Sequence, residues 1–408
     1  MVETRRQIEE DRMSELSDHL LNHILSFLNA KEAVQTCILS KRWINLWKTL
    51  STLTLSVDHF STEESFEQFI SMLLSLRDHS TDIHSLVFHF QWTHVLSRDL
   101  YLKTIEYAFS HNVQHFQILY TAVKHLPSCF FSSHTLTSLN LTGKDLMVPS
   151  GYYQIFPSSH SFNLPALTTL YLKHLSFSCN DDDDGSVVDP FSTFNMLNTL
   201  IIDRCVLRGN AQNLRISCTK LLNLTIRMYG CYSTITKPDF KIFFGLELYA
   251  PTLHSFVFNG ADYIPKFVGS KTVLSSIKHL TIHLQYCSCF EENPVNLFNL
   301  LVELANIESL TITHCVLKVL SRFHSLFEVE FPSLCYLKSL NVRAFGSSWI
   351  IAEMVDFLLQ NSPSAKFRFI ERPTALVITG CWVADYWNLK VLQTIITNKD
   401  TLLLISTC

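Results

Sequence analysis

Residues 136–141 read LTSLNL, and residues 167–172 repeat the same pattern as LTTLYL. In both stretches the first, fourth and sixth residues are apolar. Copies of this pattern follow one another at intervals of 23 to 32 residues, and they begin at Ile83, Val113, Leu136, Leu167, Leu197, Leu221, Leu253, Ile277, Ile307 and Leu337. A pattern that recurs with such a period is typical of repeat architectures, in which each copy is one structural unit.

The alternation inside each copy predicts a short strand. Side chains alternate along a strand, so the fourth and sixth residues, such as Leu139 and Leu141, point to one face. A single strand of this kind buries little, and we expect the copies to stack in parallel around a shared core. The pattern is that of leucine-rich repeats. It predicts an α/β fold, a solenoid with parallel strands on the concave face and helices or loops outside. An ordinary α/β sheet is the alternative.

The fifth and seventh residues of each copy should face away from the core. We expect this inner face to bind a protein, because it mixes aromatic, charged and hydroxyl side chains. A merely solvated strand face is the alternative for any one residue. The candidate substrate-binding residues are Asn140, Tyr171, Lys173, Asp203, Arg227, Asn259, His283 and Arg343.

Residues 11–47, DRMSELSDHLLNHILSFLNAKEAVQTCILSKRWINLW, predict three short amphipathic helices. Ser17 can cap the first helix, Asn29 with Glu32 can cap the second, and Ser40 can cap the third. The apolar side of the third helix would consist of Trp43, Leu46 and Trp47. So short a segment makes a poor core of its own, and its surplus apolar face should dock on a partner or on the following domain.

This N-terminal stretch resembles the F-box, through Leu16, Asp18, Leu20, Ile24, Leu25, Phe27, Leu28, Ala33, Val34, Thr36, Cys37, Leu39, Ser40, Lys41, Arg42, Trp43, Leu46 and Trp47. The resemblance implies binding to the Skp-type adaptor of cullin–RING ubiquitin ligases, and through it, indirectly, to the cullin. The adaptor-binding residues would be Leu16, Ser17, Leu20, Ile24, Leu25, Leu28, Val34, Leu39, Trp43 and Trp47. Ser17 stands where the family usually has proline, which predicts weaker adaptor binding. A small helical cap on the next domain is the alternative.

The rest of the chain divides around the repeats. Residues 1–10 form a polar extension, 11–50 the F-box, 51–80 a connecting segment, 81–345 the repeats, 346–370 a helical region and 371–408 a C-terminal cap. In the connecting segment, Ser61 and Glu64 predict a capping box before an apolar helical stripe that seals the open end of the repeats. The region 346–370 resembles the FBD-like end of many plant F-box proteins, through Leu337, Leu340, Val342, Leu358, Leu359, Asn361, Ser362 and Pro363.

Composition excludes several classes of function. The chain has 408 residues, 36 acidic and 32 basic, and no basic block, which argues against nucleic acid or a membrane as a partner. Phosphate-binding glycine motifs and nucleophile motifs are absent from the sequence, so we expect no enzyme activity and no cofactor. Asp181–Asp184 and the pair Cys287 and Cys289 could hold a metal, but a solvated loop and reduced thiols are the simpler interpretations, and we predict no metal site.

The sequence therefore predicts a non-catalytic substrate receptor of a cullin–RING ubiquitin ligase. It would act inside the cell, in the nucleus, the cytoplasm or both, since no signal peptide or apolar spanning segment is visible. Its protein substrate is not readable. An F-box interaction protein that works outside ubiquitin transfer is one alternative. A receptor gated by a small molecule is another, and it would need a basic pocket on the inner face.

Overall fold

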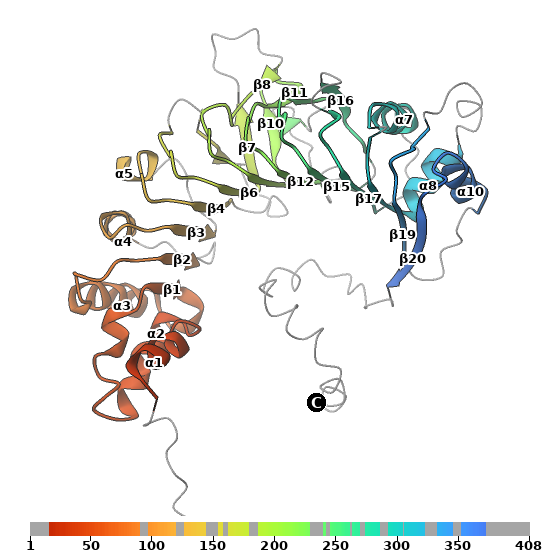
Figure 1. Cartoon of the computed structure of the whole chain (residues 1–408). Coiled ribbons are helices and arrows are strands. Elements are labelled where there is room, and N and C mark those ends of the chain that lie inside the picture. The colour runs from red at the N-terminus through yellow and green to blue at the C-terminus, as the bar shows by residue number, and fades with distance from the viewer. Residues whose placement is uncertain are drawn as a thin grey trace, which may run out of the picture.

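The computed structural model describes residues 16–89, 97–119, 126–143, 154–157, 162–178, 187–228, 240–241, 245–261, 263–269, 274–285, 293–304, 306–322, 333–345 and 352–372. One parallel sheet dominates this part of the chain (Figure 1). Its twelve strands follow one another in chain order: β1 (Thr52–Ser56), β2 (Ser85–His89), β3 (His115–Leu119), β4 (Ser138–Thr142), β6 (Thr169–Lys173), β9 (Thr199–Asp203), β12 (Asn223–Met228), β15 (Ser255–Gly260), β17 (His279–Leu284), β18 (Ser309–Thr313), β19 (Ser339–Phe345) and β20 (Lys366–Arg372). The predicted mixed α/β class is confirmed.

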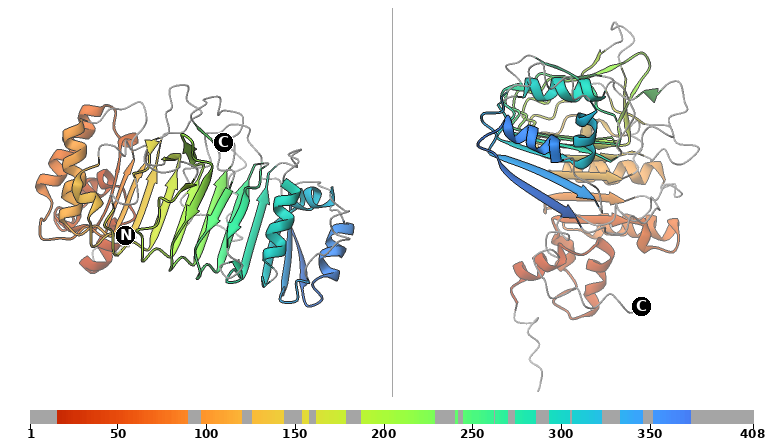
Figure 2. Two further views of the ribbon diagram at one scale, coloured as in Figure 1. Left: turned by 90° about the horizontal axis from the view of Figure 1, so that it is seen from above. Right: turned by 90° about the vertical axis from the view of Figure 1, so that its right-hand side faces the viewer.

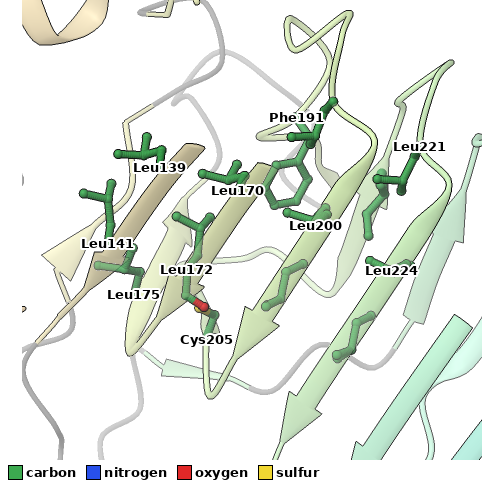
Figure 3. Close-up of a cluster of buried hydrophobic side chains, with 14 of the residues drawn as sticks. Leu139, Leu141, Leu170, Leu172, Leu175, Phe191, Leu200, Cys205, Leu221 and Leu224 are labelled. Carbon is green, nitrogen blue, oxygen red and sulfur yellow. The ribbon is translucent and has the colours of Figure 1, made fainter. Parts of the chain in front are cut away.

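The predicted strand register is confirmed at the core. The first, fourth and sixth residues of all ten copies are at most 1% exposed. Neighbouring strands align equivalent positions, so that Leu139 lies opposite Leu170 and Leu141 opposite Leu172. Figure 3 shows these leucines stacked from strand to strand.

A backbone ladder fixes this register just before each strand. The carbonyl oxygen of Gln114 accepts two hydrogen bonds, from the N–H groups of Thr137 at 2.8 Å and Ser138 at 3.0 Å. The carbonyl of Thr137 accepts the same pair from the next copy. The same double acceptance occurs at His84, Gln114, Thr137, Thr168, Asn198, Leu222, His254, Lys278 and Glu308.

The return segments differ along the sheet. Figure 1 shows the strands of the large sheet along the inner side of an arc, with the return segments on its outer side. Helices α3 (Glu63–Leu76), α4 (Arg98–Ser110) and α5 (Ser128–Phe131) return behind the first strands, and α7 (Asn293–Glu303), α8 (His314–Ser321) and α10 (Ala352–Gln360) behind the last. The middle copies return through two four-stranded sheets. One contains β5 (Gln154–Ile155), β7 (Leu175–Ser178), β10 (Val206–Arg208) and β13 (Phe240–Lys241), and the other β8 (Val187–Val188), β11 (Asn213–Ile216), β14 (Gly245–Leu248) and β16 (Lys266–Gly269).

Tight corners join the inner strands to these outer strands. His174 and Arg204 have φ angles of 53° and 50°, in the left-handed region that non-glycine residues rarely adopt. Hydrogen bonds hold the corners in a row: His174 N–H donates to the Asp203 carbonyl at 3.0 Å, and Arg204 N–H to the Arg227 carbonyl at 2.7 Å. Gly143, directly after β4, has no room for a side chain, because a Cβ there would lie 2.3 Å from the His174 carbonyl oxygen.

Between residues 16 and 50, the chain forms two α-helices and two 3₁₀ helices: α1 (Asp18–Leu25), α2 (Ala30–Gln35), η1 (Thr36–Ile38) and η2 (Leu46–Thr49). The predicted caps of the first two helices are confirmed, by Ser17 for α1 and by the reciprocal Asn29–Glu32 box for α2. The predicted third helix begins later than expected, as the 3₁₀ helix η2, and the residue at its N-cap position is Asn45 and not Ser40. Trp43, Leu46 and Trp47 are buried, as the predicted apolar side of this helix requires.

The N-terminal helices join the sheet through one continuous core. Helix α2 packs on β1, and buried Arg77 donates to the carbonyl oxygens of Leu50 and Thr81. A further 3₁₀ turn, η3 (Val57–His59), precedes α3. The predicted cap of α3 is one residue off, because Thr62 and Ser65 form the capping box. That start places Phe66, Ile70 and Leu73 in the core, as the predicted apolar stripe requires.

Helix α10 confirms the helix predicted within residues 346–370, and its buried side is formed by Met354, Val355 and Leu358. Four sequence features lie outside the described residues: the polar extension 1–10, Asp181–Asp184, the pair Cys287 and Cys289, and residues 373–408 of the predicted C-terminal cap.

Because of this register, neighbouring residues of one strand should contribute very differently to the free energy of unfolding. Leu224→Ala should lower the free energy of unfolding by about 2–5 kcal/mol, because it leaves a cavity in the core. Thr225→Ala, one residue further on, should cost about 0.5 kcal/mol or less, because that side chain is only half-buried on the inner face. Denaturant unfolding of the full chain measures both, and equal losses would contradict the register.

Candidate partner-binding surfaces

The N-terminal helices expose an unusual amount of apolar surface. Six large side chains, 38% to 84% exposed, form what we call the N-terminal patch: Leu20, Ile24, Phe27, Ile38, Leu39 and Ile44. Leu20, Ile24 and Phe27 recur at helical spacing along α1 and its end, so they share one side of that helix. The opposite side carries Leu21 and Leu25, which are fully buried. Large apolar side chains exposed in such number are suited to contact with a partner.

The predicted adaptor-binding residues divide into three groups by exposure. Ser17, Leu20, Ile24 and Leu39 are exposed, whereas Leu16, Leu28 and Val34 are half-buried. Leu25, Trp43 and Trp47 are buried in the core, so they do not present a surface.

Sequence reasoning left three patch residues out of the predicted set: Phe27, Ile38 and Ile44. The signal for Phe27 was available, since α1 carries two apolar stripes and a helix of this size can bury only one of them. Ile38 follows Val34 by four residues, which is a helical spacing, whereas no comparable periodicity marks Ile44, which lies after the η1 turn.

Arg42 connects the start of α1 to the segment between η1 and η2. Its guanidinium lies 2.6 Å from Asp18 Oδ1 and also donates to the Leu16 carbonyl. Asp18 stands in the first turn of α1, where a carboxylate complements the helix dipole. These bonds hold α1 and the segment between η1 and η2 together, and both of these parts carry residues of the N-terminal patch.

The inner face of the sheet contains a polar cluster on β6, β9 and β12. Tyr171 Oη donates to Asp203 Oδ2 at 3.0 Å, and the Arg227 guanidinium lies 3.6 Å from the same oxygen. Arg204 Nε binds Asp203 Oδ1 at 3.1 Å. Burial, followed by the negative charge of Asp203, raises the pKa of Tyr171 well above its ordinary value, so the phenol remains a hydrogen-bond donor.

This cluster corrects the expectation that all inner-face candidates are open to a partner. Lys173 and Asp203 are buried, because they lie opposite one another in register and the side chains of Tyr171 and Arg227 gather around the carboxylate. Thr311, which the strand register also placed on the open face, is buried and accepts a hydrogen bond from Asn341.

The remaining candidates lie on strands beside this cluster. Asn140 pairs in register with Tyr171, while Asn259 lies between Arg227 and His283. Arg343 lies further along, on β19. All four are half-buried. The sheet therefore brings seven of the eight predicted residues onto adjacent strands from β4 to β17, and Arg343 stands apart.

Sequence reasoning also missed a row of polar residues at the third position of the copies. It consists of Ser85, His115, Ser138, Thr169, Thr199, Asn223, Ser255, His279, Ser309 and Ser339. The signal was present in the repeat itself, at the residue before each core leucine.

A groove of about 980 Å³ lies between α3 and α4, outside the inner face. Glu64, Glu67 and Asp99 contribute carboxylates to its lining, so it differs from the basic inner-face pocket that a small-molecule-gated receptor would need. Within the described ranges, no group of three His, Cys, Asp or Glu residues is placed to hold a metal ion. Nor is any helix described there long and apolar enough to cross a membrane.

Comparison with known proteins agrees with this arrangement. Residues 13–54 match the F-box domain. The chain is 27% identical to the F-box protein At1g60400 of Arabidopsis thaliana, over 90% of this chain and 93% of that protein. It is 26% identical to the F-box/FBD/LRR-repeat protein At5g22660 of the same plant, over 88% of this chain and 76% of that protein.

The FBD-associated F-box protein At5g44490 of Arabidopsis thaliana is 24% identical, over 88% of this chain and 71% of that protein. The resemblance to plant F-box proteins with leucine-rich repeats and an FBD-like end is therefore confirmed. F-box domains in general bind Skp-type adaptors, and F-box/LRR proteins are generally substrate adaptors and not catalysts.

The Tyr171 hydrogen bond should contribute measurably to stability. Tyr171→Phe removes a donor to a buried carboxylate, which should lower the free energy of unfolding by about 1.5–3 kcal/mol. Tyr336→Phe is the matched control, because Tyr336 is exposed. Denaturant unfolding at neutral pH compares the two, and a control as costly as the Tyr171 variant would contradict the role of the bond.

Position 17 should accept proline without disturbing α1. The φ angle of Ser17 is −67°, close to the value that proline imposes, and its cap bond to Leu20 N–H is long at 3.4 Å. We expect the free energy of unfolding of Ser17→Pro to be about 0.4–1 kcal/mol higher than that of Ser17→Ala, because proline restricts the conformations of the unfolded chain. A proline variant less stable than the alanine variant would show that the backbone at Leu16 does not accept it.

Proposed function

We propose that this chain is the substrate-recognition subunit of an SCF-type ubiquitin ligase. The observation that carries the proposal is the N-terminal patch within a segment that matches the F-box domain. Apolar side chains exposed this far are not needed for the fold, since Leu21, Leu25 and the two tryptophans already fill the core beneath them. A Skp-type adaptor that covers the patch gives these side chains a partner, and the cullin follows indirectly through the adaptor.

The twelve-stranded sheet is, in this proposal, a leucine-rich-repeat solenoid that presents its concave face to a target protein. Two features support it: the strand order follows the chain, and the repeated positions are buried in the same way from β2 to β19. Residues 11–50 then form the F-box, 81–345 the repeats, 346–370 the FBD-like region and 371–408 a C-terminal cap, with 51–80 as the connection.

The target would contact the half-buried residues of the inner face, with the cluster around Asp203 as a fixed platform. Tyr171 and Arg227 are already engaged with that carboxylate, so they offer the target their ring and stem and not a free charge. Asn140, Asn259, His283 and Arg343 supply the more open contacts. Lys173 and Asp203 shape the platform from below.

The chain itself performs no chemistry in this proposal. It holds the target close to the ubiquitin-charged enzyme and raises the effective concentration of the acceptor lysines. The continuous core between α2 and β1, together with the bonds of Arg77, supports a fixed relation between the adaptor and the target. Such a complex would work in the nucleus, the cytoplasm or both.

Adaptor binding should depend on the patch and not on exposed apolar residues elsewhere. The variant Leu20→Asp with Ile24→Asp should lose about tenfold or more in affinity, because interface anchors of this kind are each worth about 1–2 kcal/mol. Titration of a purified Skp-type adaptor against the full chain measures the loss. Met72→Asp with Leu76→Asp, on α3, is the matched control, since those residues are also exposed.

The two outcomes of this experiment are distinct. An affinity unchanged in the patch variant, or lowered equally in the control, would contradict the assignment of the patch. Adding the cullin then separates ligase function from its alternative. A receptor of a ligase forms the ternary complex with adaptor and cullin, whereas an F-box protein that excludes the cullin from the adaptor works outside ubiquitin transfer.

A further inference from the structure

The N-terminal helices lie at one end of the large sheet, beyond its first strand β1 (Figure 2). The chain passes from these helices to the sheet through residues 49–52, between η2 and β1. Helix α2 also packs on β1. Apolar contacts hold two surfaces together but have little directional preference, so they leave the angle between the helices and the sheet open to small rotations. Directional contacts are needed to fix that angle.

A first set of directional contacts lies at the chain connection itself. Arg77, at the C-cap of α3, donates to the Leu50 carbonyl. The next residue, Asp78, donates its N–H to the Lys48 carbonyl at 3.1 Å. Both acceptors lie beside the covalent link between η2 and β1. Contacts so close to the link have a short lever arm, so they resist a rotation about it only weakly.

A second contact lies at the opposite end of β1. Lys31, in the first turn of α2, donates from Nζ to the carbonyl oxygen of His59, the last residue of η3. Its ammonium also lies over the ring of Phe60, 4.4 Å from the centroid, which is a cation–π contact. Phe60 is itself packed against α3, where its ring centroid lies 5.1 Å from those of both Phe66 and Phe69. Lys31 therefore joins the N-terminal helices to α3 through two kinds of contact.

The two attachments stand apart along the first strand. Strand β1 separates residues 48–50 from η3 and Phe60, and its five residues span about 17 Å. Two attachments at that separation define a direction, whereas one attachment defines only a point. The contact of Lys31 acts far from the covalent link, so it opposes a rotation that the contacts of Arg77 permit.

We propose that Lys31 is a positioning residue that sets the angle between the N-terminal helices and the sheet. Lys31 is half-buried on α2 and is not part of the N-terminal patch, so this role does not depend on contact with the adaptor. The consequence of the angle rests on the function proposed above, in which an adaptor covers the patch and a target contacts the inner face. A fixed angle would then decide which lysines of the target lie close to the ubiquitin-charged enzyme.

The test measures the angle on the full chain alone, without adaptor or target, so its result does not depend on the proposed function. Spin labels on non-canonical amino acids at Gln35 of α2 and Glu106 of α4, both exposed, report the distribution of distances between the two units. Lys31→Met keeps an unbranched side chain but removes its charge and its N–H donors. The fraction of molecules outside the main distance peak should rise roughly 2- to 30-fold, as expected for the loss of a cation–π contact.

Three further variants separate this role from a general effect of charge. Lys31→Arg keeps a cation with N–H donors and should retain the narrow distribution. Lys41→Met removes the same charge from an exposed side chain between η1 and η2, and it should also leave the distribution narrow. Phe60→Leu removes the face of the ring but keeps apolar bulk, so it should broaden the distribution as Lys31→Met does.

A distribution as narrow in Lys31→Met as in the unmodified chain would overturn the proposal, because apolar packing alone would then set the angle. Equal broadening in Lys41→Met, or an arginine variant as broad as the methionine variant, would do the same. Should Lys31→Met not fold, Phe60→Leu decides the question by the same criteria. Titration with the adaptor should give the same affinity for Lys31→Met as for the unmodified chain, and a loss would show that Lys31 contacts the adaptor and does not act through the angle.

Discussion

The double acceptance of hydrogen bonds by one carbonyl per copy is the constraint on which this architecture depends. It places the second and third residues of each copy against the second residue of the preceding one. Since side chains alternate along a strand, a slip of one residue would turn every core leucine toward solvent. The ladder and the buried positions therefore impose the same register, one through the backbone and the other through apolar burial.

The sequence predicts the features that depend on period alone. Ten copies with three apolar positions fix the strands, their parallel order and their core, and the structure agrees at Leu139, Leu170 and their equivalents. Local capping chemistry was equally readable at Ser17 and Asn29. The cap of α3 differs by one residue because the hydroxyl groups of Ser61 and Thr62 offer the same capping chemistry, which the sequence alone does not distinguish.

The candidate surfaces were less predictable because they depend on contacts between copies. The burial of Asp203 follows from Tyr171, Arg204 and Arg227, three residues that approach it only after the strands and corners form. The backbone is left-handed at His174 and Arg204, and no glycine at these positions indicates that conformation in the sequence. On the N-terminal helices, residue type does not distinguish exposed Ile24 from buried Leu25, since both belong to one broad apolar run and the neighbouring 3₁₀ segment decides which stripe is covered.

The N-terminal patch and the inner face of the sheet are connected by one continuous core. Arg77 ties the end of the N-terminal helices to the first strands, and the apolar core runs without a break from Leu21 to Leu358. A partner on the N-terminal patch and a partner on the inner face would then be held at a fixed separation. Variation of the inner-face residues outside the cluster around Asp203 leaves the core positions unchanged, because those positions lie on the opposite side of each strand.

The ladder has a further consequence for how such a chain can change in length. Each register is set by a few backbone atoms just before the strand, so the segment that returns to the next copy is free to be a helix, as at α4, or a pair of strands, as at β7 and β8. The unequal intervals between copies reflect that freedom. Duplication or loss of one whole copy preserves every remaining contact of the ladder. Gene rearrangement can therefore change the number of strands one copy at a time. The length of the inner surface then changes while the packing of the core stays the same.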